Sequence, residues 1–242
     1  MRIELIVEYL GYAYAGYQRQ NNGYTIQQAL EEAYFSLTGE QVNMTAAGRT
    51  DAGVSALAQH VHFDTNATIP PDKISYAMNT RLQDDIRIQL SRQHEGFHAR
   101  YDARGKHYRY TICNKAHASA ILAHTSWHVP YALDFAAMRQ AASAMVGEHD
   151  FRAFMAAGAQ VKTTVRTVFG LELTQQDGFI MLDVSGNGFL YNMVRIMTGT
   201  LVDVGKGKLD AQAIGGIIKA GNRALAGQTA PPQGLLLVEV FY

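Results

Sequence analysis

The order of alternating and helical stretches constrains this fold more than any other feature of the sequence. Apolar side chains occupy every second position of residues 2–9, a pattern typical of a β-strand with one buried face. Similar alternation predicts strands over residues 42–47, 59–65 and 85–93, and helices are expected over residues 26–37 and 70–80. The resulting order, strand, helix, strand, strand, helix, strand, is the split βαβ pattern of ferredoxin-like domains.

The remainder of the chain has a comparable order. Residues 106–112 alternate, residues 133–147 have a helical period, and Asp177-Gly178 predicts a hairpin turn. Helices are expected over residues 189–205 and 209–221, and a closing strand over residues 234–242. We therefore expect an α+β fold of two ferredoxin-like (RRM-like) halves with antiparallel sheets. The expected domains are residues 1–104 and residues 105–242.

Charge and cysteine content limit the class of protein. The 242 residues carry 21 Lys and Arg against 21 Asp and Glu, so a uniformly basic surface is excluded, although a local basic cleft is not. The single cysteine, Cys113, cannot form an intrachain disulfide, which fits a reducing compartment. Charged residues interrupt the N-terminal segment and no apolar run has the length of a membrane span. We expect a soluble cytoplasmic protein with no membrane contact.

Residues 47–54, with the sequence AGRTDAGV, form the most informative segment. Gly48 and Gly53 flank Arg49 and Asp51 in a tight connection between two expected strands, and glycine allows close backbone approach. Asp51 is therefore a candidate catalytic carboxylate. An ordinary turn in which Asp51 binds its own backbone is the alternative, because aspartate favours turns for that reason.

Residues 188–195, GFLYNMVR, place an arginine on an otherwise apolar predicted helix. On that helix Gly188, Asn192, Arg195 and Gly199 would share one stripe of mostly small residues. An arginine in such a setting needs an anionic partner, and Asp51 is a candidate. The alternative is that Arg195 extends to water or pairs structurally.

A basic aromatic segment, residues 97–110, is the best candidate for contact with nucleic acid. Strand alternation places Lys106, Tyr108 and Tyr110 on one face, with His107 and Arg109 on the other. An aromatic ring among cations suits stacking on a nucleobase, whereas burial of both tyrosines in the core is the alternative. The candidates for contact with an RNA backbone are Arg100, Arg104, Lys106 and Arg109.

Neither a metal site nor a phosphate loop is predicted. His60 and His62 share one strand face, but no third ligand of suitable spacing follows, so structural histidines are favoured over zinc. Residues 11–20, GYAYAGYQRQ, lack the Gly-Lys-Ser/Thr of a phosphate loop.

Taken together, these motifs closely resemble one known family. AGRTDAGV, FHAR with the KHYRY strand, GEHDFRAF, RTV, GNGFLYNMVR and the terminal APPQGLLL occur in the order seen in the tRNA pseudouridine synthase A family. The resemblance extends from Tyr9 to Val240, nearly the whole chain, and GRTDAGV combined with GNGFLYNMVR is highly specific.

The resemblance implies an isomerase that converts uridine to pseudouridine at positions 38, 39 and 40 in the anticodon stem-loop of tRNA. It implies that Asp51 is the nucleophile acting on a flipped-out base and that Tyr108 contacts that base. Arg195 would pair with the catalytic carboxylate, Arg49 would hold the flipped nucleotide, and Leu235 would line the pocket. The resemblance also implies that the two halves join into one continuous catalytic body with a central cleft. It further implies a homodimer whose subunits share the RNA cleft. The reaction neither oxidises nor transfers a group, so no cofactor or metal is expected.

Two departures and three rival interpretations remain. Ser55 and Asn192 stand where the family often has histidine, next to key residues. A non-catalytic RNA-binding protein would explain the basic aromatic strand but not the glycine-flanked Asp51. A nucleoside hydrolase would release free base, yet such enzymes usually use two carboxylates, and no second acid lies near Asp51 in the sequence. A purely structural domain leaves the combined motifs unexplained.

Overall fold

The computed structural model describes residues 1–158 and 161–242 as a mixed α+β protein whose strands pair mostly antiparallel. The chain forms two compact units. Unit 1 contains residues 1–104 together with residues 236–242, and unit 2 contains residues 105–235. No helix in the described part of the chain has the length and apolar character needed to cross a membrane.

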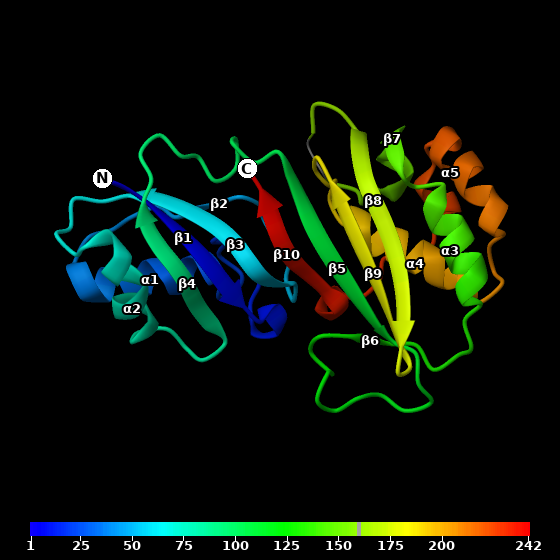
Figure 1. Ribbon diagram of the computed structural model, residues 1–242, viewed down its shortest axis with the longest axis horizontal. Coiled ribbons are helices and arrows are strands. Elements are labelled where there is room, and N and C mark those ends of the chain that lie inside the picture. Colours follow the sequence, from blue (N-terminus) through cyan, green and yellow to red (C-terminus); the bar gives the residue numbers. More distant parts are fainter. Residues whose placement is uncertain (159–160) are drawn as a thin grey trace. The chain divides into compact units, whose positions relative to one another are not determined.

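Unit 1 is built on a sheet with the order β4–β1–β3–β10, and β2 pairs with β3 as well. Strand β1 runs antiparallel to both β3 and β4, whereas β10 is parallel to β3 through the pairs Leu236–Ser55 and Leu237–Ala56. Helices α1 and α2 lie on one face of this sheet (Figure 1). The elements are β1 (Arg2–Tyr9), α1 (Ile26–Thr38), β2 (Thr45–Ala46), β3 (Ser55–Asp64), α2 (Ile74–Asn79), β4 (Ile86–Gln93) and β10 (Leu235–Phe241).

Helix α1 forms where the sequence predicts it. The Thr25 side chain accepts a hydrogen bond from the Gln28 amide at 3.2 Å, and Gly39 ends the helix in the left-handed conformation with φ 70°. Its buried face includes Tyr34, whose ring meets the Phe63 ring edge-on at 4.8 Å. This packing buries the apolar side of β1 and β3, which is the alternating side identified in the sequence.

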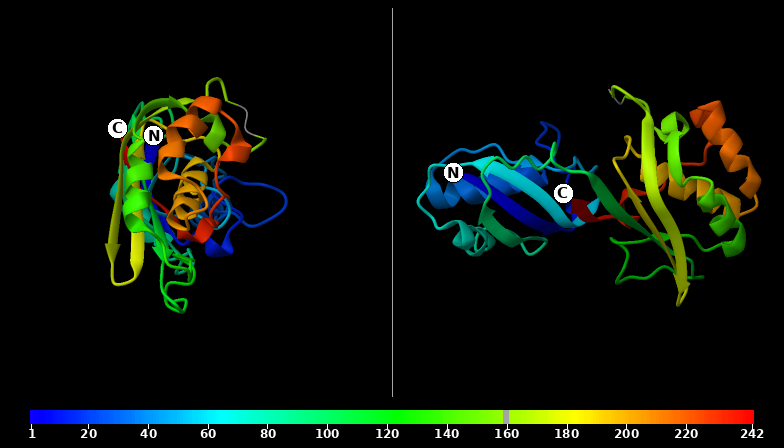
Figure 2. Two further views of the ribbon diagram at one scale, coloured as in Figure 1. Left: turned by 90° about the vertical axis from the view of Figure 1, so that its right-hand side faces the viewer. Right: turned by 45° about the horizontal axis from the view of Figure 1, so that its top comes forward.

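Unit 2 is built on a sheet with the order β5–β9–β8–β7, and the short β6 pairs with β5. The three helices of this unit gather on one side of the sheet (Figure 2). The β8–β9 hairpin turns at Asp177 and Gly178 with φ of 51° and 77°, which confirms the expected two-residue turn. The elements are β5 (Gly105–Cys113), β6 (Trp127–His128), α3 (Phe135–Ser143), β7 (Gly147–Asp150), β8 (Val165–Gln176), β9 (Phe179–Gly186), α4 (Met193–Gly205) and α5 (Ile214–Ala220).

The core of unit 2 surrounds α4. Ile196, Met197 and Leu201 are fully buried, as are most residues of this helix. Gly199 lies against the chain near Gln228, and a Cβ atom there would come within 1.8 Å of the Gln228 carbonyl oxygen. The helix can therefore contact this segment only because residue 199 has no side chain.

The structure differs from the expectations at four points. Helix α4 begins at Met193, so Gly188 does not belong to its expected stripe; Asn192, at φ 60°, sets the boundary. Residues 236–242 were expected in the second half, but backbone pairing with β3 places them in unit 1. The strand over residues 42–47 shortens to Thr45–Ala46. Helix α3 ends at Ser143, short of the expected residue 147, and Gly147–Asp150 form β7, a strand that was not expected.

Candidate functional site

Asp51 lies in the connection between β2 and β3, on a loop whose backbone is held at both ends. The Gln59 amide nitrogen donates to the Gly48 carbonyl at 2.8 Å, and the Gly48 amide donates to the Gln59 side-chain oxygen at 3.3 Å. On the other side, the Val54 amide donates to the Asp51 carbonyl at 3.1 Å. Gly53 has φ 80°, so the expected need for glycine in this loop is met there. Asp51 is half-buried and Arg49 is exposed.

The residue before Asp51 is tied to β1. Thr50 is buried, and its hydroxyl shares a hydrogen bond of 2.8 Å with the Tyr9 hydroxyl. Burial raises the pKa of Tyr9 to about 12, so this phenol stays neutral at physiological pH. The side chain of Gln59 also reaches the Tyr9 hydroxyl, at 3.4 Å. A neutral, buried network therefore fixes the backbone that carries Asp51.

Residues 10–17 form a brace against the same loop. The Thr50 carbonyl accepts from the Tyr17 amide at 3.0 Å, and the Tyr14 carbonyl accepts from the Gly53 amide at 3.3 Å. Gly16 has φ 97°, and a Cβ atom there would lie 2.8 Å from the Thr50 carbonyl oxygen. From the sequence, this segment was weighed only as a phosphate loop, and its contact with the Asp51 loop was not predicted. Its two glycines spaced among tyrosines are the signal for such close backbone packing.

Ser55, at the start of β3, has a defined role in this brace. Its buried hydroxyl oxygen accepts a hydrogen bond from the Gly11 amide at 3.0 Å. Gly11 itself packs so closely that a Cβ atom would lie 2.0 Å from the Val54 carbonyl oxygen. Ser55 thus anchors residues 10–17 to the end of the Asp51 loop.

Tyr108 projects from β5 in unit 2, opposite Val184 of β9. Its half-buried ring meets the Phe189 ring edge-on, with centroids 5.3 Å apart and an interplanar angle of 88°. Two residues further along the same face, Tyr110 is fully buried and donates its hydroxyl to the Pro231 carbonyl at 2.7 Å. The alternative of core burial therefore applies to Tyr110, whereas Tyr108 keeps part of its surface exposed.

Arg195 is held by two oxygen acceptors within unit 2. Its Nε donates to the Ala230 carbonyl at 2.7 Å, and one Nη donates to the Asn192 side-chain oxygen at 2.7 Å. The Ala230 amide donates back to the Arg195 carbonyl at 3.1 Å, which fixes the two segments together. Asn192 thus orients the guanidinium.

The terminal APPQGLLL motif links Arg195 to the tyrosine strand. Ala230 contacts Arg195, and Pro231 accepts the Tyr110 hydroxyl. Gly234 lies against the Tyr110 ring, where a Cβ atom would approach ring carbons to 2.6 Å. Leu235, which follows directly, is 7% exposed. Residues 230–235 therefore connect Arg195 to Tyr110 of β5 and fix the position of Leu235.

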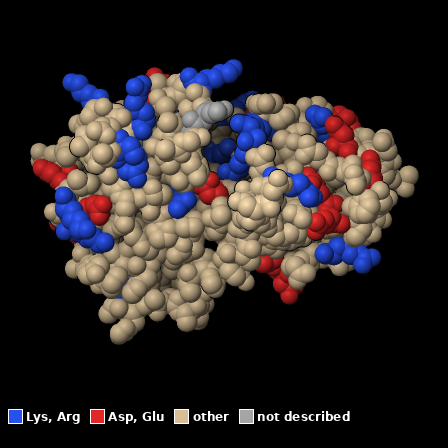
Figure 3. All heavy atoms as spheres, turned by 180° about the vertical axis from the view of Figure 1, so that it is seen from behind, with Lys and Arg blue, Asp and Glu red and all other residues tan. Residues whose placement is uncertain are grey.

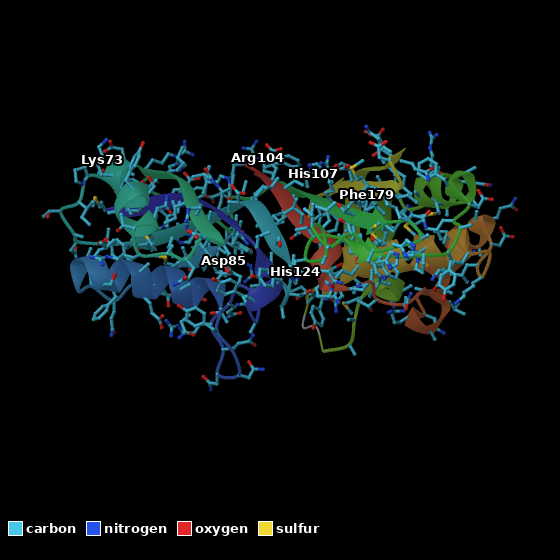
Figure 4. The ribbon with its side chains drawn as sticks, turned by 90° about the horizontal axis from the view of Figure 1, so that it is seen from below. Lys73, Asp85, Arg104, His107, His124 and Phe179 are labelled. Atoms are coloured by element: carbon cyan, nitrogen blue, oxygen red, sulfur yellow. The ribbon has the colours of Figure 1, made fainter. Side chains whose placement is uncertain are left out.

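The basic segment is only partly available for nucleic acid. Arg109 and His107 both bind the carboxylate of Asp183, at 3.0 and 2.7 Å, so this face of β5 is neutralised (His107 is labelled in Figure 4). Arg109 is thus a weak candidate for a phosphate contact. Arg100 and Arg104 are exposed, and Lys106 is half-buried. On the face drawn in Figure 3 side chains of both signs occur, in keeping with the neutral total charge.

The histidines on β3 have structural partners. His60 Nδ1 lies 2.7 Å from the buried Glu4 carboxylate, and His62 Nδ1 accepts from the Ala99 amide at 3.1 Å. Within residues 1–158 and 161–242, no group of three or more His, Cys, Asp or Glu side chains is arranged to hold a metal ion.

Comparison with known proteins decides the family. The model of a family described as tRNA pseudouridine synthase matches residues 5–102 and 141–242. The chain belongs to the tRNA pseudouridine synthase family. It is 49% identical over 99% of both chains to tRNA pseudouridine synthase A of Acetivibrio thermocellus. The protein of that name from Ruminiclostridium cellulolyticum is 51% identical, over all of this chain and 99% of the relative.

A structural match is much weaker. A chain from the crystal structure of a Cbf5–Nop10–Gar1 complex aligns with 97% of this chain and 48% of its own length, at 12% identity and a TM-score of 0.38.

Family membership makes the protein an isomerase, because pseudouridine and uridine have the same composition. Of the residues expected at the site, Asp51 and Arg49 belong to unit 1, whereas Tyr108, Arg195 and Leu235 belong to unit 2.

Proposed function

We propose that this protein isomerises uridine to pseudouridine in tRNA with Asp51 as the nucleophile. The support is the membership of the family together with the GRTDAGV loop, whose backbone is fixed by hydrogen bonds from β1, residues 10–17 and β3. A carboxylate that must meet one atom of a flipped nucleotide needs such a fixed support, because small displacements reduce the rate strongly. The proposal includes the finer fold expected from the sequence, two ferredoxin-like halves.

The reaction breaks the C1′–N1 bond, rotates the base and forms a C1′–C5 bond. Asp51 attacks either the ribose or the base, and the bond that it forms breaks again before the product leaves. The proton on C5 is lost to solvent and N1 gains a proton, so the atoms balance without an external reagent. Tyr108 contacts the base and helps to remove the C5 proton, which passes on to solvent. In this proposal, Arg195 keeps the Asp51 carboxylate ionised.

Reaching the uridine requires the base to leave its stack, at a cost of about a few kcal/mol. Arg49 holds the flipped nucleotide and Leu235 provides an apolar wall in this proposal. The target is uridine at positions 38, 39 and 40 of the anticodon stem-loop. The homodimer implied by the resemblance stays a prediction, and light scattering of the protein alone and with tRNA measures it.

Tritium release from tRNA labelled at C5 of uridine tests the proposal. The wild-type chain releases tritium, and Asp51→Ala and Asp51→Asn do not, whereas Asp72→Asn, an exposed acid in the same unit, behaves as wild type. Replacing the uridines at positions 38 to 40 by cytidine one at a time assigns the target. Absence of release from wild type on unmodified tRNA would exclude the synthase function, and free uracil would indicate hydrolysis instead.

A further inference from the structure

Arg166, at the start of β8, is a half-buried cation with no acidic partner in the part of the chain that the structure describes. One of its terminal nitrogens donates to the carbonyl oxygens of Thr163 and Val165, at 2.9 and 2.6 Å. Among the described residues, no carboxylate forms an ion pair with it and none accepts from its Nε or its second terminal nitrogen. Asp150 on the neighbouring strand binds Arg152 and Thr164 instead.

A structural role accounts for only part of this arrangement. The two carbonyl contacts use one nitrogen and fix the guanidinium, but they leave its other edge without an acceptor from residues 1–158 and 161–242. Burial lowers the pKa of Arg166 from its ordinary value, because removing the cation from water is costly. A guanidinium edge that is fixed, desolvated and not neutralised matches two oxygen atoms of a phosphate.

The position of Arg166 relates it to Tyr108. Lys106, Gly186 and Val168 are paired in one row across β5, β9 and β8, and Arg166 lies two residues before Val168 on the same face. The connection after β9 covers this edge of the sheet. Gly188 has no side chain there, and a Cβ atom would lie 3.6 Å from Arg166 Nε.

The next residue of that connection, Phe189, packs against the Tyr108 ring at 5.3 Å between centroids. The Thr167 amide, beside Arg166, donates to the Asn187 side-chain oxygen at 3.0 Å, and this contact holds the connection in place. Arg166 and Tyr108 are therefore linked through one short, fixed segment of unit 2.

We propose that Arg166 binds a backbone phosphate of the RNA strand that carries the target uridine, on the same face of the unit 2 sheet as Tyr108. This rests on the proposed function, which supplies an RNA substrate whose flipped base contacts Tyr108. Gly188 gives the sugar-phosphate backbone room to approach the guanidinium, and Thr163 and Val165 hold the guanidinium in place before the RNA arrives.

The test measures tRNA affinity as a function of salt, together with tritium release, for Arg166→Gln and Arg166→Lys. Loss of one phosphate contact raises the Kd about tenfold for Arg166→Gln. It also lowers the slope of log Kd against log salt by about 0.7 to 1. The catalytic efficiency, kcat/KM, falls mainly because KM rises, while kcat changes little, since the contact is present both before and during the reaction. Arg166→Lys keeps the charge and therefore keeps the wild-type salt slope.

Arg139→Gln, an exposed arginine on α3, is the matched control and leaves affinity and slope unchanged. An Arg166→Gln variant with the wild-type salt slope, while wild type still releases tritium, overturns this inference alone. A fall in kcat at wild-type Kd and slope also overturns it, since that pattern indicates a purely structural residue. Absence of tritium release from wild type would remove the proposed function, and this inference with it.

Discussion

At the scale of single residues, the Asp51 loop depends on glycines that permit close contact. Gly16 combines φ 97° with a backbone approach to Thr50 that a Cβ atom would block at 2.8 Å. Gly39, in contrast, has φ 70° with no atom within 4 Å of its would-be Cβ. Both glycines have a positive φ that would strain any residue with a Cβ atom, but only Gly16 is in close contact with another segment of the backbone.

Gly16→Ala is expected to displace the Asp51 loop and lower the rate of tritium release at saturating tRNA by about tenfold or more. It should also lower the free energy of unfolding by about 1 kcal/mol or more from backbone strain. Gly39→Ala should cost about 1 kcal/mol of stability, with the rate unchanged. Equal rates for the two variants would contradict the role given to the brace.

The amide of Asn192 provides a second test at this scale. Asn192→Gly keeps the left-handed backbone at φ 60° but removes the oxygen that holds Arg195. We expect kcat to fall about tenfold, because the guanidinium loses one of its fixed acceptors. Steady-state tritium release measures this. Asn222→Gly, which removes the side-chain cap of a short helix, should leave kcat unchanged.

At the scale of elements, the strands of unit 1 are joined by a buried carboxylate. Glu4 of β1 is fully buried and is bound by His60 of β3 at 2.7 Å and by Arg92 of β4 at 2.7 Å. His94 adds a third contact at 2.7 Å. Burial by itself raises the carboxyl pKa, but the hydrogen bonds from these three partners outweigh it and lower the pKa of Glu4 to about 2.

This lowered pKa predicts how the stability of the protein depends on pH. The unfolded chain has a glutamate pKa of about 4.3, so the contribution of Glu4 is fully present above that pH and is lost as pH falls toward about 2. We expect about 3 kcal/mol of acid-dependent stability from this group. Urea unfolding measures the free energy of unfolding between pH 5 and pH 3. This free energy should depend less steeply on pH in Glu4→Gln than in wild type. Glu8→Gln on the same strand is the control, and an unchanged slope in Glu4→Gln would contradict the assignment.

At the scale of the whole molecule, the last residues of the chain, 236–242, belong to unit 1 together with residues 1–104. Strand β10 pairs in parallel with β3, the Arg104 amide donates to the Phe241 carbonyl at 2.8 Å, and Tyr242 donates to the Ala99 carbonyl at 2.8 Å. Leu237 of this strand is fully buried. The last seven residues therefore complete the sheet that begins with β1.

Removal of residues 236–242 is therefore expected to weaken unit 1 more than unit 2. Amide hydrogen exchange should show lost protection in β3, while the β8–β9 hairpin of unit 2 keeps its protection. Tyr242→Phe, which removes only one hydrogen bond, should cost about 1 kcal/mol and leave protection in β3 nearly unchanged. Equal loss in both units would contradict the division of the chain.

Local pattern determined much of this protein. Alternation located β1, β4 and β5, and the Thr25 and Gly39 caps bounded α1, because these features depend on neighbouring residues and on backbone geometry. The Asp177-Gly178 turn was fixed in the same local way. The motif order led to the family, which the comparisons confirmed.

Only the tertiary structure decided the rest, since it depends on contacts between segments far apart in the chain. The pairing of Arg109 with Asp183, across two strands, could not be derived from either residue alone. The same holds for Gly16 against Thr50 and for Arg195 against Ala230. The start of α4 at Met193 follows from the left-handed Asn192, a backbone state that an apolar helical period does not reveal. Sequence thus led to the family and to the candidate site residues, and long-range packing determined which contacts hold those residues.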